Sequence, residues 1–278
     1  MTGVQTCALP IYYDPLATLD ELDAMTTEKT RVLYLETPGS LTFEMQDVPA
    51  LAAWAKDRGI RTIIDNTWAT GLYFKPLDHG IDISSHAATK YMCGHSDVIS
   101  GAIICNKDTT LAVETTRDQL GLAMPPDEAY LGLRGLRTMA VRLPVHWENG
   151  LKLASYLSGR EEVANVLHPA MEQDPGYAIW SRDFSGASGL FSVVMRSDVS
   201  WEQLNAFVDA LQLYGVGYSW GGFESLCVLQ NPKAIRTGSH WPRPGISEGY
   251  VLRFHAGLED ADDLIADVEQ AFHAMKKA

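Results

Sequence analysis

The sequence predicts an α/β protein with a mostly parallel sheet, followed by a smaller α+β region toward the C-terminus. In the first half, short apolar runs of strand length alternate with helix-like segments, which is typical of βαβ units and parallel strands. In the second half, the predicted strands are fewer and their connections are more varied. A chain of 278 residues, 46% of them hydrophobic and 21% charged, is long enough for one large or two ordinary domains.

Capping and turn residues bound the elements of the first half. Asp47 is a suitable N-cap with Pro49 just inside its helix, and Gly59 is a common type of C-terminal stop. We expect a short helix at 19–26, a helix at 47–59 and strands at 31–36, 62–65, 82–87 and 98–105.

The second half begins with a long helical connector. Residues 126–159 predict this helix, which Pro144 interrupts because a proline inside a helix removes a backbone hydrogen bond. The predicted division is an artefactual leader at 1–11, the remainder of a larger domain at 12–137 and a smaller domain at 138–278. Beyond the connector we expect strands at 163–166, 189–195 and 251–255, a helix at 200–213 and an amphipathic closing helix at 260–276.

The first eleven residues, MTGVQTCALPI, are interpreted separately. They lack the basic start and the cleavage signal of a secretory peptide. The string resembles the in-frame translation of a common sequencing-library adapter, read from a GTG start codon. We therefore exclude it from fold reasoning and expect the protein proper to begin at about Tyr12.

Composition and charge exclude several classes of function. The net charge of −13 argues against nucleic acid as the main partner, because phosphate binding needs a basic face. No apolar run reaches the roughly 18–20 residues of a membrane span. The four cysteines include no C-x-x-C pair, and the eight histidines lack zinc-site spacing, so we expect reduced thiols, no metal and a cytoplasmic protein.

The segment 82–96, DISSHAATKYMCGHS, contains the first candidate for chemistry. Lys90 follows a strand and a run of small residues, which would let a flat ring approach the backbone, and the Thr89 hydroxyl could bond a phosphate oxygen. A lysine that forms a Schiff base must be partly desolvated, so that its amine is neutral for part of the cycle. Taken alone, a lysine after a strand is more often a solvated surface residue.

Asp65 and Arg253 are the second and third candidates. Asp65 follows an apolar strand directly and should lie at the carboxyl edge of the parallel sheet, where it could pair with a protonated pyridine nitrogen. The alternative for Asp65 is a helix cap or turn. Arg253 lies inside an apolar strand, and its planar fork suits bidentate binding of a carboxylate. A structural ion pair is the alternative for Arg253.

These residues carry a resemblance to a known family. DISSHAATKYMCGHS is similar, position by position, to the attachment signature of the Cys/Met metabolism enzymes that depend on pyridoxal 5′-phosphate (PLP). LETPGSLTFEMQDVP, IIDNTWATG, YSWGGFES and LRFHAGLEDADDLIADVEQAF resemble further blocks of this family, in the expected order. The resemblance runs from Tyr12 to the C-terminus, and TPGS and YSWGGFES look most like its bacterial cystathionine β-lyase branch. It implies an aspartate aminotransferase-like fold of type I.

The resemblance also implies roles at the matching positions. Lys90 would carry PLP as a Schiff base and shuttle the proton at the substrate Cα, Asp65 would hold the pyridinium and Thr89 would contact the phosphate. The implied reaction is α,β-elimination of L-cystathionine to homocysteine, pyruvate and ammonia, in methionine biosynthesis. The implied partner is a small sulfur amino acid.

The C-terminal half would supply the substrate contacts. Arg253 would bind the α-carboxylate with help from Ser219 and Trp220, and Tyr218 would line the pocket. A γ-lyase, a γ-synthase or a cysteine desulfhydrase on the same scaffold stays an open alternative.

The chain also departs from the family. Roughly the first third of a family member has no counterpart before Tyr12, including a phosphate-binding turn, a tyrosine that stacks on the ring, and a tyrosine and an arginine that reach the neighbouring subunit's cofactor. Family members assemble as dimers of dimers, and we expect the full-length parent to do the same. This polypeptide itself is alternatively an inactive fragment.

Overall fold

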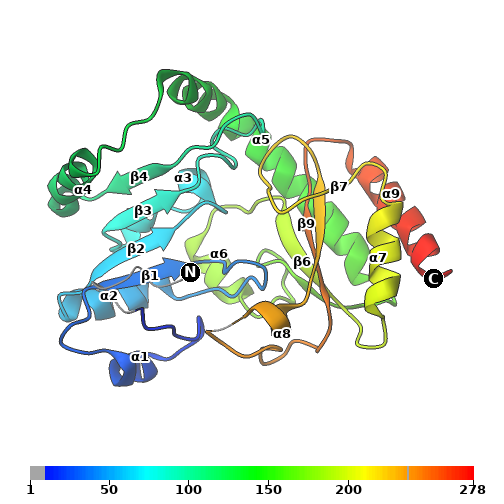
Figure 1. Cartoon of the computed structure of the whole chain (residues 1–278). Coiled ribbons are helices and arrows are strands. Elements are labelled where there is room, and N and C mark those ends of the chain that lie inside the picture. The colour runs from blue at the N-terminus through cyan, green and yellow to red at the C-terminus, as the bar shows by residue number, and fades with distance from the viewer. Residues whose placement is uncertain (1–9, 237) are drawn as a thin grey trace.

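The computed structural model describes residues 10–236 and 238–278, and most of the predicted leader (1–9) lies outside them. Two separate sheets form the framework, and Figure 1 shows them in the two halves of the molecule, with the C-terminal helix at the far end of the second half. No helix in the described ranges combines the length and the apolar character that crossing a membrane requires.

The first sheet has the strand order β1-β2-β3-β4. Its first three strands are parallel, as predicted, whereas β4 runs antiparallel to β3. The sheet is therefore mixed, because the segment that joins β3 to β4 contains turns and no crossover helix. The strands of this sheet are β1 (Val32–Glu36), β2 (Arg61–Asp65), β3 (Ile83–His86) and β4 (Ala102–Cys105).

The helices around the first sheet begin and end as local chemistry dictates. The Asp47 side chain accepts a hydrogen bond from the Ala50 N–H at the start of α2, and Gly59 follows the end of α2 with a positive φ of 65°. Helix α4 was not predicted; it is polar, and little of it is buried. The helical elements are α1 (Leu19–Met25), α2 (Val48–Asp57), α3 (Thr70–Tyr73), the 3₁₀ turn η1 (Pro76–His79) and α4 (Lys107–Gln119).

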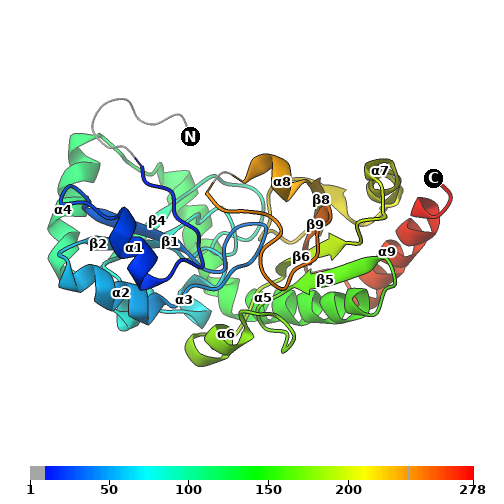
Figure 2. The same ribbon diagram turned by 90° about the horizontal axis from the view of Figure 1, so that it is seen from below.

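The connector is one continuous helix, α5 (Pro126–Ser158), and Figure 2 shows it passing from the first sheet to the second. The predicted interruption at Pro144 is wrong. Burial of Leu143 and His146 on either side of the proline holds the helix together despite the missing N–H donor. The predicted division between residues 137 and 138 falls inside this helix and stays a prediction.

The second sheet has the order β5-β6-β9-β8-β7, and every neighbouring pair except β7–β8 is antiparallel. It has five strands against four in the first sheet, so the expectation of fewer strands here is wrong, and β7 and β8 were missed. The strands are β5 (Val163–Leu167), β6 (Leu190–Met195), β7 (Gly215–Val216), β8 (Leu226–Gln230) and β9 (Val251–His255), and the helices are α6 (Tyr177–Asp183), α7 (Trp201–Ala210), α8 (Pro232–Ile235) and α9 (Ala261–Met275).

The second sheet is covered on both faces, which explains the nearly continuous burial of β6 and β9. Alternate residues such as Phe191 and Phe254 face a core shared with α5, α7 and α9. Leu190 and Val251 face the other core, which they share with the first sheet. Arg253 alternates with Phe254 along β9, so it lies on the face toward the first sheet.

Candidate active site

Lys90 lies in the turn that joins β3 to β4, where its backbone N–H donates to the Ala87 carbonyl at 3.0 Å. Its Nζ donates a hydrogen bond to Ser219 Oγ at 2.8 Å and lies 5.4 Å from the centre of the Trp220 ring. Burial, and then the nearby Arg253 guanidinium, lower the pKa of the Lys90 amine. The amine is therefore easier to neutralise than that of a solvated lysine.

A buried arginine supports this turn from α5. Arg142 donates from one terminal nitrogen to the carbonyls of Tyr91 and Gly135, both at 2.9 Å. The Tyr91 ring is fully buried beside Lys90, and its hydroxyl accepts the Gly189 N–H at 3.1 Å. Sequence reasoning missed Arg142, whose only signal was an arginine at a helix position that turns out to be buried.

Asp65 ends β2, where its register partners are Glu36 of β1 and Ser85 of β3. One carboxylate oxygen accepts the Thr67 N–H at 2.8 Å, and the other accepts no hydrogen bond within the described part of the chain. The Thr67 hydroxyl accepts the Ala87 N–H at 2.8 Å, so it ties the loop after Asp65 to the loop that carries Lys90.

Glu36 is a titratable group that sequence reasoning missed. Although the residue is exposed, its carboxyl is desolvated by surrounding protein atoms and lies near the carboxylates of Asp65 and Glu44, and these effects raise its pKa to about 7. The only sequence signal was that β1 ends on an acid, as β2 does.

Arg253 reaches from β9 toward the same region as Lys90. Its guanidinium donates to the Tyr218 carbonyl at 2.6 Å, and among the described residues it forms no ion pair with a carboxylate. Burial lowers its pKa. A partly buried cation without an acid nearby is costly, which favours the expectation that an outside anion binds there over the structural ion pair.

The other predicted residues lie around this pair in different ways. Ser219 contacts Lys90, as described, whereas the Tyr218 side chain is 72% exposed and its hydroxyl accepts from Gln230 Nε2 at 2.9 Å. The Thr89 hydroxyl donates to the Ser100 carbonyl at 3.1 Å and accepts the Ser100 N–H at 2.8 Å. Its single donor is therefore already used, and a phosphate contact would require it to rotate.

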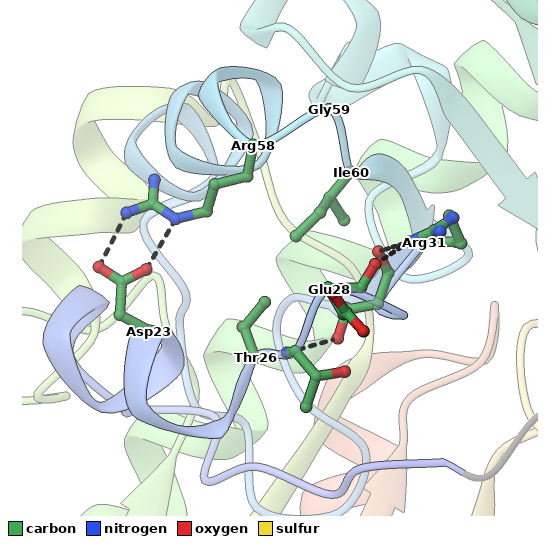
Figure 3. Close-up of a pocket in the computed structure, with 9 residues that line it drawn as sticks. Asp23, Thr26, Glu28, Arg31, Arg58, Gly59 and Ile60 are labelled. Carbon is green, nitrogen blue, oxygen red and sulfur yellow. Dashed lines mark hydrogen bonds and ion pairs between the residues drawn. The ribbon is translucent and has the colours of Figure 1, made fainter.

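A surface hollow lies elsewhere, between the end of α1 and the end of α2 (Figure 3). It has a volume of about 480 Å³, but both of its cations are engaged. Arg58 pairs with Asp23, and Arg31 donates to the carbonyls of Glu28 and Thr30. The hollow is open, and none of the residues that the sequence predicts for chemistry lines it.

Comparisons with known proteins confirm the family resemblance that the sequence motifs indicate. A family described as Cys/Met metabolism PLP-dependent enzyme matches residues 4–273. The chain is 42% identical to cystathionine beta-lyase of Escherichia coli and 43% identical to cystathionine beta-lyase of Bordetella avium. These alignments cover 94% and 90% of this chain but 66% and 62% of the relatives, so the chain spans less than two thirds of their length.

Solved structures give the same result for the fold. Cystathionine gamma synthase from Xanthomonas oryzae pv. oryzae superposes with a TM-score of 0.83 at 32% identity, over 93% of this chain and 66% of that one. Cystathionine gamma-lyase from Lactobacillus plantarum gives 0.82 at 30% identity, over 93% and 68%. The chain belongs to the family of Cys/Met metabolism PLP-dependent enzymes.

Proposed function

We propose that the protein is a carbon–sulfur lyase that cleaves L-cystathionine by α,β-elimination to homocysteine, pyruvate and ammonia. The observation that carries this proposal is the convergence of Lys90 and Arg253 on one loop, through Ser219 and the Tyr218 carbonyl. The relatives that are 42 and 43% identical over the aligned residues are both named cystathionine beta-lyase. A small sulfur amino acid is therefore the proposed partner.

The residues present fit the PLP on which the family depends. Asp65 keeps one oxygen without a hydrogen bond in the described structure, which suits a pyridinium N–H, and the Lys90 amine is partly desolvated. Ala87 and Ala88 leave room beside Lys90, and Thr89 is the proposed phosphate contact once its hydroxyl turns from Ser100. When bound, PLP supplies an electron sink that stabilises negative charge at the substrate Cα.

The chain's own residues would bind the substrate and move its proton. Arg253 would exchange its bond to the Tyr218 carbonyl for a two-pronged contact with the substrate carboxylate, as its planar fork allows. The neutral Lys90 amine would take the Cα proton while Ser219 fixes the direction of its lone pair. The Cβ–S bond then breaks, sulfur leaves with homocysteine, and water converts the remaining three carbons to pyruvate and ammonia.

The first test uses the 278-residue chain with added PLP. We expect an absorbance band of amine-bound PLP in the visible or near-visible range, and borohydride reduction should fix the label on the Lys90 peptide. Lys90→Ala should abolish the band, the label and pyruvate release, because no other group supplies the amine. Lys107→Ala, an exposed lysine on α4, is the matched control and should change none of them.

Two outcomes would contradict the assignment. The role of Lys90 is wrong if Lys90→Ala keeps the band and the pyruvate release. The β-elimination is wrong if the enzyme converts cystathionine to 2-oxobutyrate, which indicates cleavage on the γ side. A relative from Wolbachia pipientis wMel, 36% identical, is named L-alanine/L-glutamate racemase, so loss of optical rotation from alanine would favour a proton shuttle without elimination.

A second candidate, for this polypeptide as it stands, is a fragment that binds PLP without turnover. The observation in its favour is exposed apolar surface on the first half, where Ile99 is 92% and Leu111 75% exposed. Sedimentation and pyruvate assays on the same sample separate the two candidates. A chain that sediments as a defined species and releases pyruvate contradicts the fragment, whereas an aggregating chain without turnover supports it.

A further inference from the structure

His255 ends β9 and is 1% exposed, directly behind the loop that contacts Lys90. Its Nε2 accepts the Gly221 N–H at 3.0 Å, and its Nδ1 lies 3.1 Å from the Glu224 carbonyl. A carbonyl oxygen only accepts, so Nδ1 must carry the proton and Nε2 must carry the lone pair. Both bonds are satisfied only by the neutral ring in this one tautomer.

The loop held by His255 presses against the backbone at Lys90. This loop, residues 218–224, joins β7 to β8 and is called the 218–224 loop below. Gly221 has a φ of 81°, and a Cβ built on it would lie 2.9 Å from Lys90 Cβ and 2.9 Å from the Tyr91 nitrogen. No side chain fits there, so the Gly221 backbone packs directly on the lysine turn.

His255 and Arg253 hold the same loop from one face of β9. They are two residues apart on one strand, so their side chains point to the same side of the sheet. Arg253 holds the Tyr218 carbonyl, and His255 holds the Gly221 N–H three residues later. Between these two points lie Ser219 and Trp220, which contact the Lys90 amine.

We propose that His255 is a positioning residue, which fixes the 218–224 loop on the lysine turn and thereby places Ser219 and Trp220 against the Lys90 amine. This inference deepens the proposed function and rests on it for the meaning of Lys90. Three further hydrogen bonds hold the loop. Ser96 Oγ donates to the Glu224 carboxylate at 2.6 Å, the Leu258 N–H donates to the Phe223 carbonyl at 2.8 Å, and Gln230 Nε2 donates to the Tyr218 hydroxyl at 2.9 Å. The first two lie beyond Gly221 and the third holds only the Tyr218 side chain, so none of them bonds Ser219 or Trp220.

The surroundings of His255 keep its ring neutral, as the two hydrogen bonds require. His146 of α5 lies 5.2 Å away between ring centres, and Tyr91 lies 5.8 Å away. Burial, followed by His146, Arg253 and Lys90, lowers the pKa of His255 well below its ordinary value, opposed only by its bond to the Glu224 carbonyl. None of these three neighbours is an acid that would favour the imidazolium.

Two substitutions of His255 distinguish the roles of its two ring nitrogens. His255→Gln keeps an acceptor near the Nε2 position and should retain the Gly221 bond. His255→Asn keeps a donor near Nδ1 for the Glu224 carbonyl but loses that acceptor. His146→Asn is the matched control, because His146 is 0% exposed and donates to the Ala256 carbonyl but does not touch the loop.

Two measurements on this 278-residue chain report on the loop and on Lys90. Amide hydrogen exchange at Gly221 should rise about fivefold in His255→Asn, since one hydrogen bond contributes about 1 kcal/mol. The pH midpoint for PLP and borohydride labelling of the Lys90 peptide should move upward, toward that of an ordinary lysine. His255→Gln should stay near wild type on both measurements, and His146→Asn should lower the melting temperature without moving the labelling midpoint.

The proposal is overturned if His255→Asn leaves both measurements unchanged, or if His146→Asn changes them equally, which indicates a purely structural role. If His255→Asn does not fold, the histidine ¹⁵N spectrum of the unmodified chain decides, because an Nε2–H tautomer at His255 contradicts the proposal. If the unmodified chain does not label at Lys90, the proposed function fails instead, and Gly221 exchange still tests the position of the loop.

Discussion

Asp267 of α9 organises a turn that is distant from it in the sequence. It is 5% exposed, and its carboxylate accepts the backbone N–H groups of Gln212, Leu213 and Tyr214 at 2.8, 2.8 and 3.1 Å. These three donors follow α7 and have no helical partners. A carboxylate can accept all three bonds, whereas an amide replaces one accepting oxygen with an NH₂ donor.

Replacing Asp267 by asparagine should therefore leave one or two buried or partly buried N–H groups unpaired. We expect Asp267→Asn to lower the free energy of unfolding by about 2 kcal/mol, measured by urea denaturation. Asp263→Asn, at an exposed position in the first turn of the same helix, should change it by less than about 1 kcal/mol. Equal effects of the two substitutions would show that the three hydrogen bonds to Asp267 do not contribute to the free energy of unfolding.

At the scale of elements, α5 packs against the lysine turn through a glycine. A Cβ built on Gly135 would lie 2.2 Å from the Cys93 carbonyl and 2.5 Å from the Met92 carbonyl. One turn earlier, a Cβ on Gly132 would meet Cys93 Sγ at 3.7 Å, which is an ordinary contact. The helix backbone therefore packs directly on the backbone of the turn at Gly135, whereas Gly132 leaves room for a methyl group.

These two glycines give opposite predictions for the same substitution. Alanine is favoured over glycine inside a helix by about 1 kcal/mol, so Gly132→Ala should stabilise the protein by up to that amount. Gly135→Ala should destabilise it by about 2 kcal/mol or more, because the backbone of the turn must move. Thermal and urea unfolding of the pair provide the measurement, and a stabilised Gly135→Ala would contradict the close packing.

At the scale of the whole molecule, buried histidines control how stability depends on pH. Burial lowers the pKa of His146 and of His168 to about 4, and that of His255 well below its ordinary value. Histidines in an unfolded chain have a pKa near 6.5. Below that pH, the unfolded chain therefore binds protons that the buried histidines of the folded chain do not bind. Stability is therefore fully present above about pH 6.5 and is lost as the pH falls toward 4.

Between pH 6.5 and 5.5, each of these histidines should cost about 1 kcal/mol of folding free energy. Glu36, with its pKa raised to about 7, acts in the opposite direction, by at most about 1 kcal/mol because the residue is exposed. We expect a net loss of about 2 kcal/mol in urea denaturation. His168→Gln should reduce that loss by about the amount that one histidine contributes. If the free energy of unfolding does not change between pH 6.5 and 5.5, the buried histidines are not neutral as inferred.

The predictions from sequence succeeded where the signal was local. The caps at Asp47 and Ser200 begin α2 and α7, and β9 spans residues 251–255 as predicted. Predictions failed where a partner decided the outcome. Nothing around Pro144 shows that its helix is held by packing on both sides, and nothing in residues 226–230 shows that they pair with β9.

The sequence by itself determined the family, the lysine turn and the position of Asp65 at a strand end, because short motifs and strand periods depend on neighbouring residues. Only the tertiary structure decided that β4 returns antiparallel and that Lys90 meets Ser219, 129 residues later in the chain. It also decided that His255 holds Gly221, across 34 residues. Such contacts depend on how two sheets pack together, and that packing is set by the burial of both cores at once.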